Sequence, residues 1–176
     1  MKKLFILATI LAAILFVACA PSDDKMLVKI HKMENDMKVI TKPDSNAVKV
    51  LLGMYQDFAK RFPEDSLAPD FLYKGAGIEV GFNRGSQAVE LYEFIKTTYP
   101  TYQRMPECVF MEAYTYENIL GNTAKAGMLY HEFLAKYPRH ELADDAQAAI
   151  KYLGKSPEEM IHDFEQNQAA VDSAKK

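Results

Sequence analysis

Beyond the first 20 residues, apolar side chains recur at steps of three and four along most of the chain. Tyr92, Ile95 and Tyr99 are one example, and this spacing places their side chains on a single face of a helix. Polar and charged residues fill many of the intervening positions, as on the solvent side of an amphipathic helix. The pattern therefore predicts an all-α protein.

The helical pattern occurs three times, and each copy ends in an aromatic residue followed by proline. The pairs are Phe62-Pro63, Tyr99-Pro100 and Tyr137-Pro138, and the spacings between them are 37 and 38 residues. Proline ends a helix because it lacks an N–H donor and restricts the residue before it. The apolar positions that recur upstream, and that we expect in the core, are Leu51, Tyr55 and Phe58, then Ala88, Tyr92 and Ile95, then Ala126, Tyr130 and Phe133.

A second helix is expected after each of the three turns, over residues 67–82, 106–120 and 142–153. Ser86 and Thr123 are the expected N-caps of the helices that follow the first two of these. Two helices per repeat cannot bury their apolar faces alone, so the chain is predicted to stack into a right-handed solenoid of antiparallel helix pairs. An unrelated helical bundle with coincidental aromatic–proline ends is the alternative.

The repeat domain is expected to cover residues 25–165. Residues 25–40 are predicted to form an amphipathic helix that pairs with a helix starting near Ser45. Ser156 and Glu159 have the spacing of a capping box, which predicts a last helix. The polar residues 166–176 are expected to form a flexible tail.

The N-terminus has the order of a secretory signal, with two lysines, a short apolar stretch and then small residues. The apolar run from Leu4 to Ala20 has 17 residues and is stopped by Pro21. A transmembrane helix needs about 20 apolar residues. Residues 1–18 are therefore predicted to be a signal peptide, and an uncleaved membrane anchor is the alternative.

Phe16-Val17-Ala18-Cys19 resembles the lipobox of bacterial lipoproteins, although leucine is commonest where Phe16 stands. The resemblance implies cleavage before Cys19 and covalent acylation of that cysteine, with residues 19–24 as a lipidated tether. Ala20 resembles an outer-membrane address, which implies a lipid-anchored protein facing the periplasm. The acidic cluster at residues 22–25 resembles the export signal of surface lipoproteins, so the cell surface is the alternative location. An ordinary free cysteine is the alternative for Cys19.

The repeat resembles tetratricopeptide repeats, through the small-xxx-aromatic spacing, the aromatic–proline ends and the Ala-Asp-Asp-Ala motif at residues 143–146. It is similar to those of BamD-type outer-membrane assembly lipoproteins and of the Tol-Pal periplasmic coordinator, over about residues 47–165. BamD proteins have about five repeats, whereas this chain has room for three full helix pairs and part of a fourth. The C-terminal repeats that engage the barrel-assembly pore protein in that family are therefore expected to be missing. The repeat consensus implies a groove near Asp70, Tyr73, Gly77, Met111, Thr115 and Asn118.

The sequence offers no catalytic constellation. The four histidines form no H-x-x-x-H pair, and neither a G-x-S-x-G motif nor a phosphate-binding loop is present. We therefore expect a non-catalytic protein with no metal and no cofactor beyond the covalent lipid on Cys19. Cys108 has apolar neighbours and is expected to be a small buried hydrophobe. Gly75, Gly77 and Gly81 are expected to permit close helix packing.

The preferred function is an interaction scaffold of the bacterial envelope, with other envelope proteins or peptides as partners in the groove and a connection to outer-membrane protein assembly by resemblance. The formal net charge of -3, with no evident basic stripe, argues against nucleic acid as a partner. Two alternatives stay open. The first is an accessory lipoprotein that binds a small molecule or glycan in the same groove. The second is a structural spacer whose groove is filled by its own tail.

Overall fold

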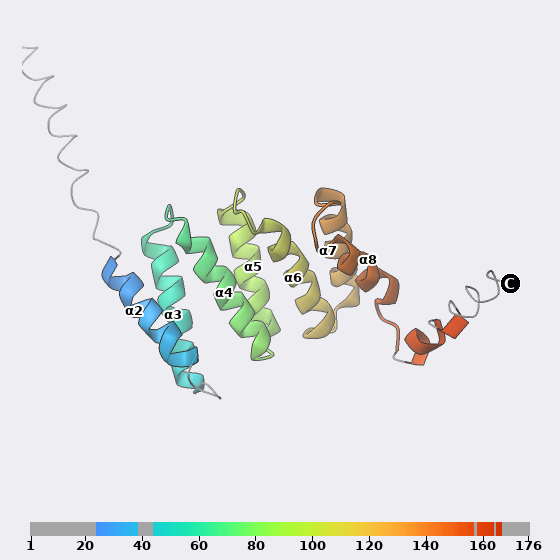
Figure 1. The fold of residues 1–176 in the computed structure, drawn as a ribbon, viewed down its shortest axis with the longest axis horizontal. Helices are drawn as coiled ribbons and strands as arrows, with labels where there is room; N and C mark the ends of the chain where they lie inside the picture. Colours follow the sequence, from blue (N-terminus) through green and yellow to red (C-terminus); the bar gives the residue numbers. More distant parts are fainter. Residues whose placement is uncertain (1–23, 39–43, 157, 164, 167–176) are drawn as a thin grey trace, which may run out of the picture. The chain divides into compact units, whose positions relative to one another are not determined.

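The computed structural model describes residues 24–38, 44–156, 158–163 and 165–166. These residues form helices joined by turns, and no strand occurs among them, so the prediction of an all-α fold is confirmed for this part of the chain (Figure 1). The predicted signal peptide, Cys19 and nearly all of the predicted tail lie outside the described residues. The helices are α2 (Asp24–Lys38), α3 (Ser45–Arg61), α4 (Leu67–Gly81), α5 (Gly85–Thr98), α6 (Met105–Asn118), α7 (Thr123–Lys136) and α8 (Ala143–Tyr152).

The chain divides into two compact units, Met1–Phe58 and Ala59–Lys176, and the boundary falls within α3. In the first unit, α2 buries Ile30 and α3 buries Tyr55. The Tyr55 hydroxyl donates a hydrogen bond of 2.7 Å to Glu34 Oε1, which ties α3 to α2. Burial and this hydrogen bond raise the pKa of Tyr55 far above its usual range, so the phenol is a permanent donor.

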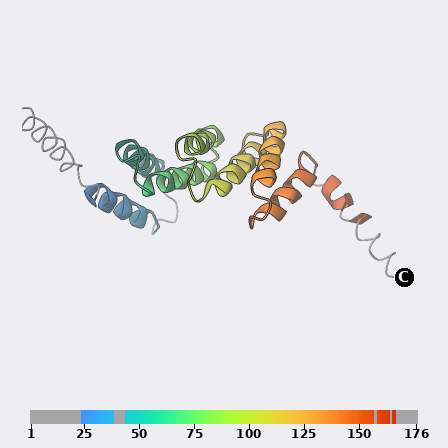
Figure 2. The same ribbon diagram turned by 90° about the horizontal axis from the view of Figure 1, so that it is seen from above.

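In the second unit, each helix from α4 to α8 packs against the next one in sequence. Seen from above, α5 and α7 lie on one side of this unit, and α4 and α6 lie on the other (Figure 2). The aromatic–proline pairs set these bounds, because α5 ends at Thr98 and α7 ends at Lys136, each one residue before its aromatic. The predicted second helices are confirmed to within two residues at each end.

The recurring apolar positions form the core, as predicted. Tyr92 and Tyr130 are each 1% exposed, and the residues one turn before and after them on their helices are fully buried. Each tyrosine meets an aromatic ring of the preceding helix edge-on: Tyr73 lies 6.0 Å from Tyr92, and Phe110 lies 5.5 Å from Tyr130 between ring centroids. The equivalent pair of aromatic side chains therefore packs in the same way in two successive repeats.

The helix caps differ in part from the prediction. The capping box is confirmed, because the Ser156 N–H donates to Glu159 Oε2 at 2.7 Å and the Glu159 N–H donates to Ser156 Oγ at 3.2 Å. Asn122 rather than Thr123 caps α7, and its Oδ1 accepts from the Lys125 N–H at 3.0 Å. The predicted cap at Ser86 is wrong, because α5 already begins at Gly85.

Candidate functional site

A polar contact recurs where the second-unit helices meet. The Tyr102 hydroxyl donates a hydrogen bond of 2.6 Å to Asp70 Oδ1 on α4. One repeat later, His140 Nε2 lies 3.9 Å from Glu107 Oε2 on α6. Tyr102 and His140 each stand two residues after the proline of their own repeat, and each acid stands seven residues after the proline of the preceding repeat. The Tyr102 hydrogen bond holds the turn before α6 against α4, and His140 brings the turn before α8 close to α6 without a hydrogen bond to Glu107.

The same turn position also begins the next helix. Asp65 Oδ1 accepts from the Leu67 N–H at 2.8 Å, and His140 Nδ1 accepts from the Leu142 N–H at 3.2 Å. Because Nδ1 of His140 accepts a hydrogen bond, the proton of its neutral ring lies on Nε2, the atom that faces Glu107. His140 therefore stabilises the turn that leads into α8 and lies near the previous repeat at the same time.

Arg104 covers the outer face of Tyr73. Its guanidinium carbon lies 4.0 Å from the centroid of the Tyr73 ring, and its Nε lies 3.5 Å from Glu107 Oε1. Burial raises the pKa of Tyr73, and the positive charge of Arg104 opposes that rise. The stacking holds a flexible arginine and a half-buried tyrosine in one arrangement at the surface.

A stripe of exposed and half-buried side chains runs along α4 and along α6, at steps of four, three and four residues. We refer to it as the α4–α6 stripe; its members are Asp70, Lys74, Gly77, Gly81, Glu107, Met111, Tyr114 and Asn118. Both helices pack on α5, and the buried residues of each helix are at other positions than those of the stripe. The stripe is thus the surface that α4 and α6 leave open.

The glycines of the stripe are not at close helix crossings. A Cβ added at Gly77 or Gly81 would meet nothing within 4 Å. The prediction that these two glycines permit close packing is therefore wrong, whereas Gly75 is buried. Gly77 and Gly81 instead leave the backbone of α4 open at these two positions.

Of the six predicted groove residues, four lie on the stripe: Asp70, Gly77, Met111 and Asn118. Tyr73 lies beside it, under Arg104. Thr115 has no exposed surface, and its hydroxyl donates to the Met111 carbonyl at 2.7 Å, so it cannot line a groove. The residue that the sequence analysis missed is Tyr114, which is 39% exposed. Tyr114 stands three residues after Met111, and this spacing alone would have placed it on the same face of the helix.

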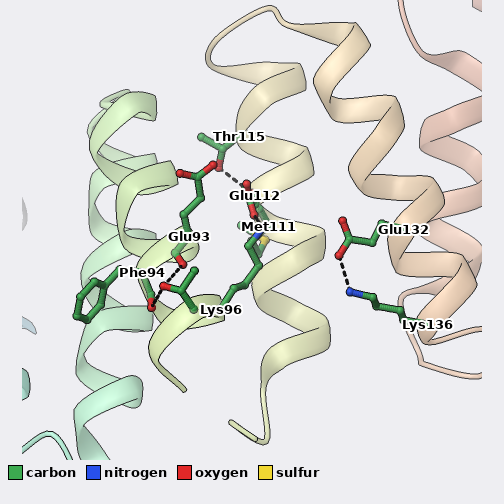
Figure 3. A network of polar contacts seen from close by, with 9 residues as sticks. Glu93, Phe94, Lys96, Met111, Glu112, Thr115, Glu132 and Lys136 are labelled. Atoms are coloured by element: carbon green, nitrogen blue, oxygen red, sulfur yellow. Dashed lines mark hydrogen bonds and ion pairs between the residues drawn. The ribbon is translucent and has the colours of Figure 1, made fainter. Parts of the chain in front are cut away.

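A buried ion pair joins α5 to α6 behind the stripe. Lys96 Nζ contacts Glu112 Oε2, and the Glu112 side chain is 1% exposed (Figure 3). Among the described residues Glu112 Oε1 has no hydrogen-bond partner. Burial raises the pKa of Glu112, and the neighbouring Lys96 charge opposes the rise. The pair fixes which part of α6 faces α5, because a slip would leave the Glu112 carboxylate buried without its counter-ion.

Two observations concern the thiol and metal chemistry of the described residues. Cys108 is fully buried, as predicted, and burial raises the pKa of its thiol to about 12. The thiolate is therefore scarce at neutral pH. Within residues 24–38, 44–156, 158–163 and 165–166, no three histidine, cysteine or acidic side chains gather in a way that could hold a metal ion. The helices described there are also too short or too polar to cross a membrane.

No family model matches the chain, and no curated protein matches its sequence significantly.

Proposed function

We propose that the chain is a lipoprotein, acylated on Cys19, that acts as a non-catalytic protein-interaction scaffold at the bacterial outer membrane. In this proposal the helix pairs stack as a right-handed, tetratricopeptide-like solenoid that faces the periplasm. The α4–α6 stripe lines its docking face, and the partner is a peptide or helix of another envelope protein. A role in outer-membrane protein assembly follows from the sequence resemblance.

The recurring contact between repeats supports the solenoid. Tyr102 with Asp70 and His140 with Glu107 use the same two repeat positions, one repeat apart. In a bundle without repeats, equivalent positions have no reason to meet equivalent partners. In a solenoid they must, because every unit packs on the next through the same surface.

The observation that carries the scaffold proposal is the composition of the surface around the stripe. Tyrosine, arginine and methionine are enriched where proteins meet, and Tyr73, Arg104, Met111 and Tyr114 lie at or beside the stripe. Arg104 is already stacked on Tyr73, so binding would immobilise few additional rotamers. The open backbone at Gly77 gives a partner side chain room on the same stripe.

Site-specific photocrosslinking in the native membrane tests the docking face. A photoreactive phenylalanine analogue replaces Tyr114, and the control places it at Phe94 on α5, which is 49% exposed. We expect a discrete protein adduct from position 114 that is absent at 94 and is lost when Gly77→Trp adds a bulky side chain to the stripe. Equal adducts from both positions would refute a docking face on the stripe, and a glycan-only adduct would favour the accessory-lipoprotein alternative.

The anchor is tested separately. Cys19→Ser should move the protein from the membrane fraction to the soluble fraction, because the acyl chains supply most of the membrane affinity. The variant with Cys108→Ser is the matched control and should stay in the membrane fraction. Retention of the Cys19→Ser variant on membranes would contradict acylation and favour an uncleaved anchor.

A further inference from the structure

Three lysines share one exposed face of α2. Lys25, Lys29 and Lys32 follow one another at steps of four and three, and all three are exposed. Val28 lies among them on the same face and is 67% exposed. The opposite face carries Ile30, which is fully buried. We refer to the four exposed residues as the α2 lysine face.

The lysines of this face form no ion pair with any residue that the structure describes, whereas His31 and Glu34 on the same helix pair with each other at 3.1 Å. The lysines gather three positive charges in two turns, and Asp36, four residues after Lys32, is the acid that continues the same face. The face therefore has a net positive charge in a mildly acidic protein. Val28, which is two-thirds exposed, adds an apolar side chain to this cluster.

α2 begins close in sequence to the predicted membrane attachment at Cys19. Lys25 comes six residues after Cys19 and five after the end of the apolar run at Ala20. Six residues span at most about 22 Å even when fully extended. An acylated Cys19 and an uncleaved apolar anchor would both therefore hold the start of α2 close to the bilayer surface.

We propose that the α2 lysine face lies against the membrane and binds anionic phospholipid headgroups, with Val28 entering the interface. The inference rests on membrane attachment at the N-terminus, as proposed above. Each lysine near an anionic surface favours the bound state about fivefold, so three together contribute on the order of a hundredfold. The face is thus a second membrane signal beside the anchor, and it orients the first helix pair on the bilayer.

The test uses the full acylated chain in vesicles. An environment-sensitive dye is attached to Val28→Cys, and the control attaches it to Val50→Cys on α3, which is 53% exposed. Cys108 is fully buried and does not compete for the dye. Vesicles contain either phosphatidylcholine alone or phosphatidylcholine with 30% phosphatidylglycerol, and emission is recorded in low salt and in 0.5 M NaCl. Flotation of the vesicles is measured in the same samples.

We expect the dye at position 28 to shift to the blue in the anionic vesicles at low salt, and to lose at least half of that shift in 0.5 M NaCl, because salt screens exposed charges. Replacing Lys25, Lys29 and Lys32 by glutamine should abolish the shift without altering the circular dichroism melt. The dye at position 50 should not respond. A floating protein whose dye at position 28 stays in water would overturn the inference and favour a protein partner for this face. A protein that fails to float would overturn the anchor itself.

Discussion

The buried ion pair between α5 and α6 allows a sharp test of how the repeats are held in register. Lys96 and Glu112 come from adjacent repeats, and the Glu112 side chain is almost completely removed from water. Lys96→Met keeps the length of the stem and removes the charge. Glu112→Leu removes the negative charge and leaves an apolar side chain of similar volume. The double variant replaces the ion pair with two apolar side chains.

The magnitudes follow from burial. Lys96→Met leaves the Glu112 carboxylate buried without a counter-ion and should lower the free energy of unfolding by about 3–5 kcal/mol. Glu112→Leu should be milder, because the Lys96 side chain is 23% exposed and its ammonium can turn to water. The double variant should recover most of the loss and lie close to the unmodified protein, since an apolar pair has no desolvation penalty.

The pH dependence has a definite sign. Burial raises the folded-state pKa of Glu112 above its value in the unfolded chain, so the folded state binds the proton more readily. The penalty for the buried charge is therefore fully present above the folded pKa and is relieved as pH falls through it toward the unfolded value. The loss caused by Lys96→Met should shrink over that window, and the double variant should show no such trend.

Urea unfolding followed by circular dichroism measures all four proteins. The exposed pair Lys136 with Glu132, at 2.8 Å on α7, is the control, and Lys136→Met should change stability by no more than a few tenths of a kcal/mol (Figure 3). If Lys96→Met were as mild as Lys136→Met, Glu112 would have access to water. The register of α5 on α6 would then differ from the one described.

Three further outcomes are expected. Gly77→Ala should stabilise the protein by about 0.5–1 kcal/mol in a thermal melt, because it replaces a mid-helix glycine where a Cβ meets nothing; destabilisation would mean that this position is covered. Asn122→Ala should lower stability by about 1 kcal/mol in urea, because it removes the side-chain cap of α7, whereas an unchanged midpoint would argue against that cap. Tyr102→Phe should lower stability by about 1.5–3 kcal/mol, because it removes the hydroxyl bonded to the Asp70 carboxylate; in the Asp70→Asn background the loss should be smaller, and equal losses would disprove the coupling.

The sequence was sufficient to predict the helices and the apolar side chains that they bury. Tyr92 and Tyr130 recur at a fixed distance before proline, and a period that repeats on one helix face can only mean a shared core. The capping box at Ser156 was also predictable, because it depends on two residues three apart. The hydrogen bonds of a capping box join residues three apart in sequence, so the local sequence alone is enough to predict them.

The errors arise where a single residue step or a distant partner decides the outcome. Thr115 and Tyr114 are neighbours in sequence, but a turn of 100° per residue puts one in the core and the other on the surface. The pairing of Lys96 with Glu112 depends on how α5 crosses α6, which no spacing reveals. The lysine face of α2 was missed in the same way, because overall charge hides a local cluster.

The repeat itself separates structural positions from candidate binding positions. Asp70 and Glu107 are equivalent, and both meet the following turn, so an acid at that position is explained by stacking alone. Gly77 and Tyr114 are also equivalent, each fourteen residues after a proline, yet one leaves the backbone open and the other exposes an aromatic ring. Stacking cannot require both a glycine and a tyrosine at the same exposed place. The difference between them is therefore the feature of the stripe that a partner would have to match, since it provides open space in one repeat and an exposed aromatic ring in the next.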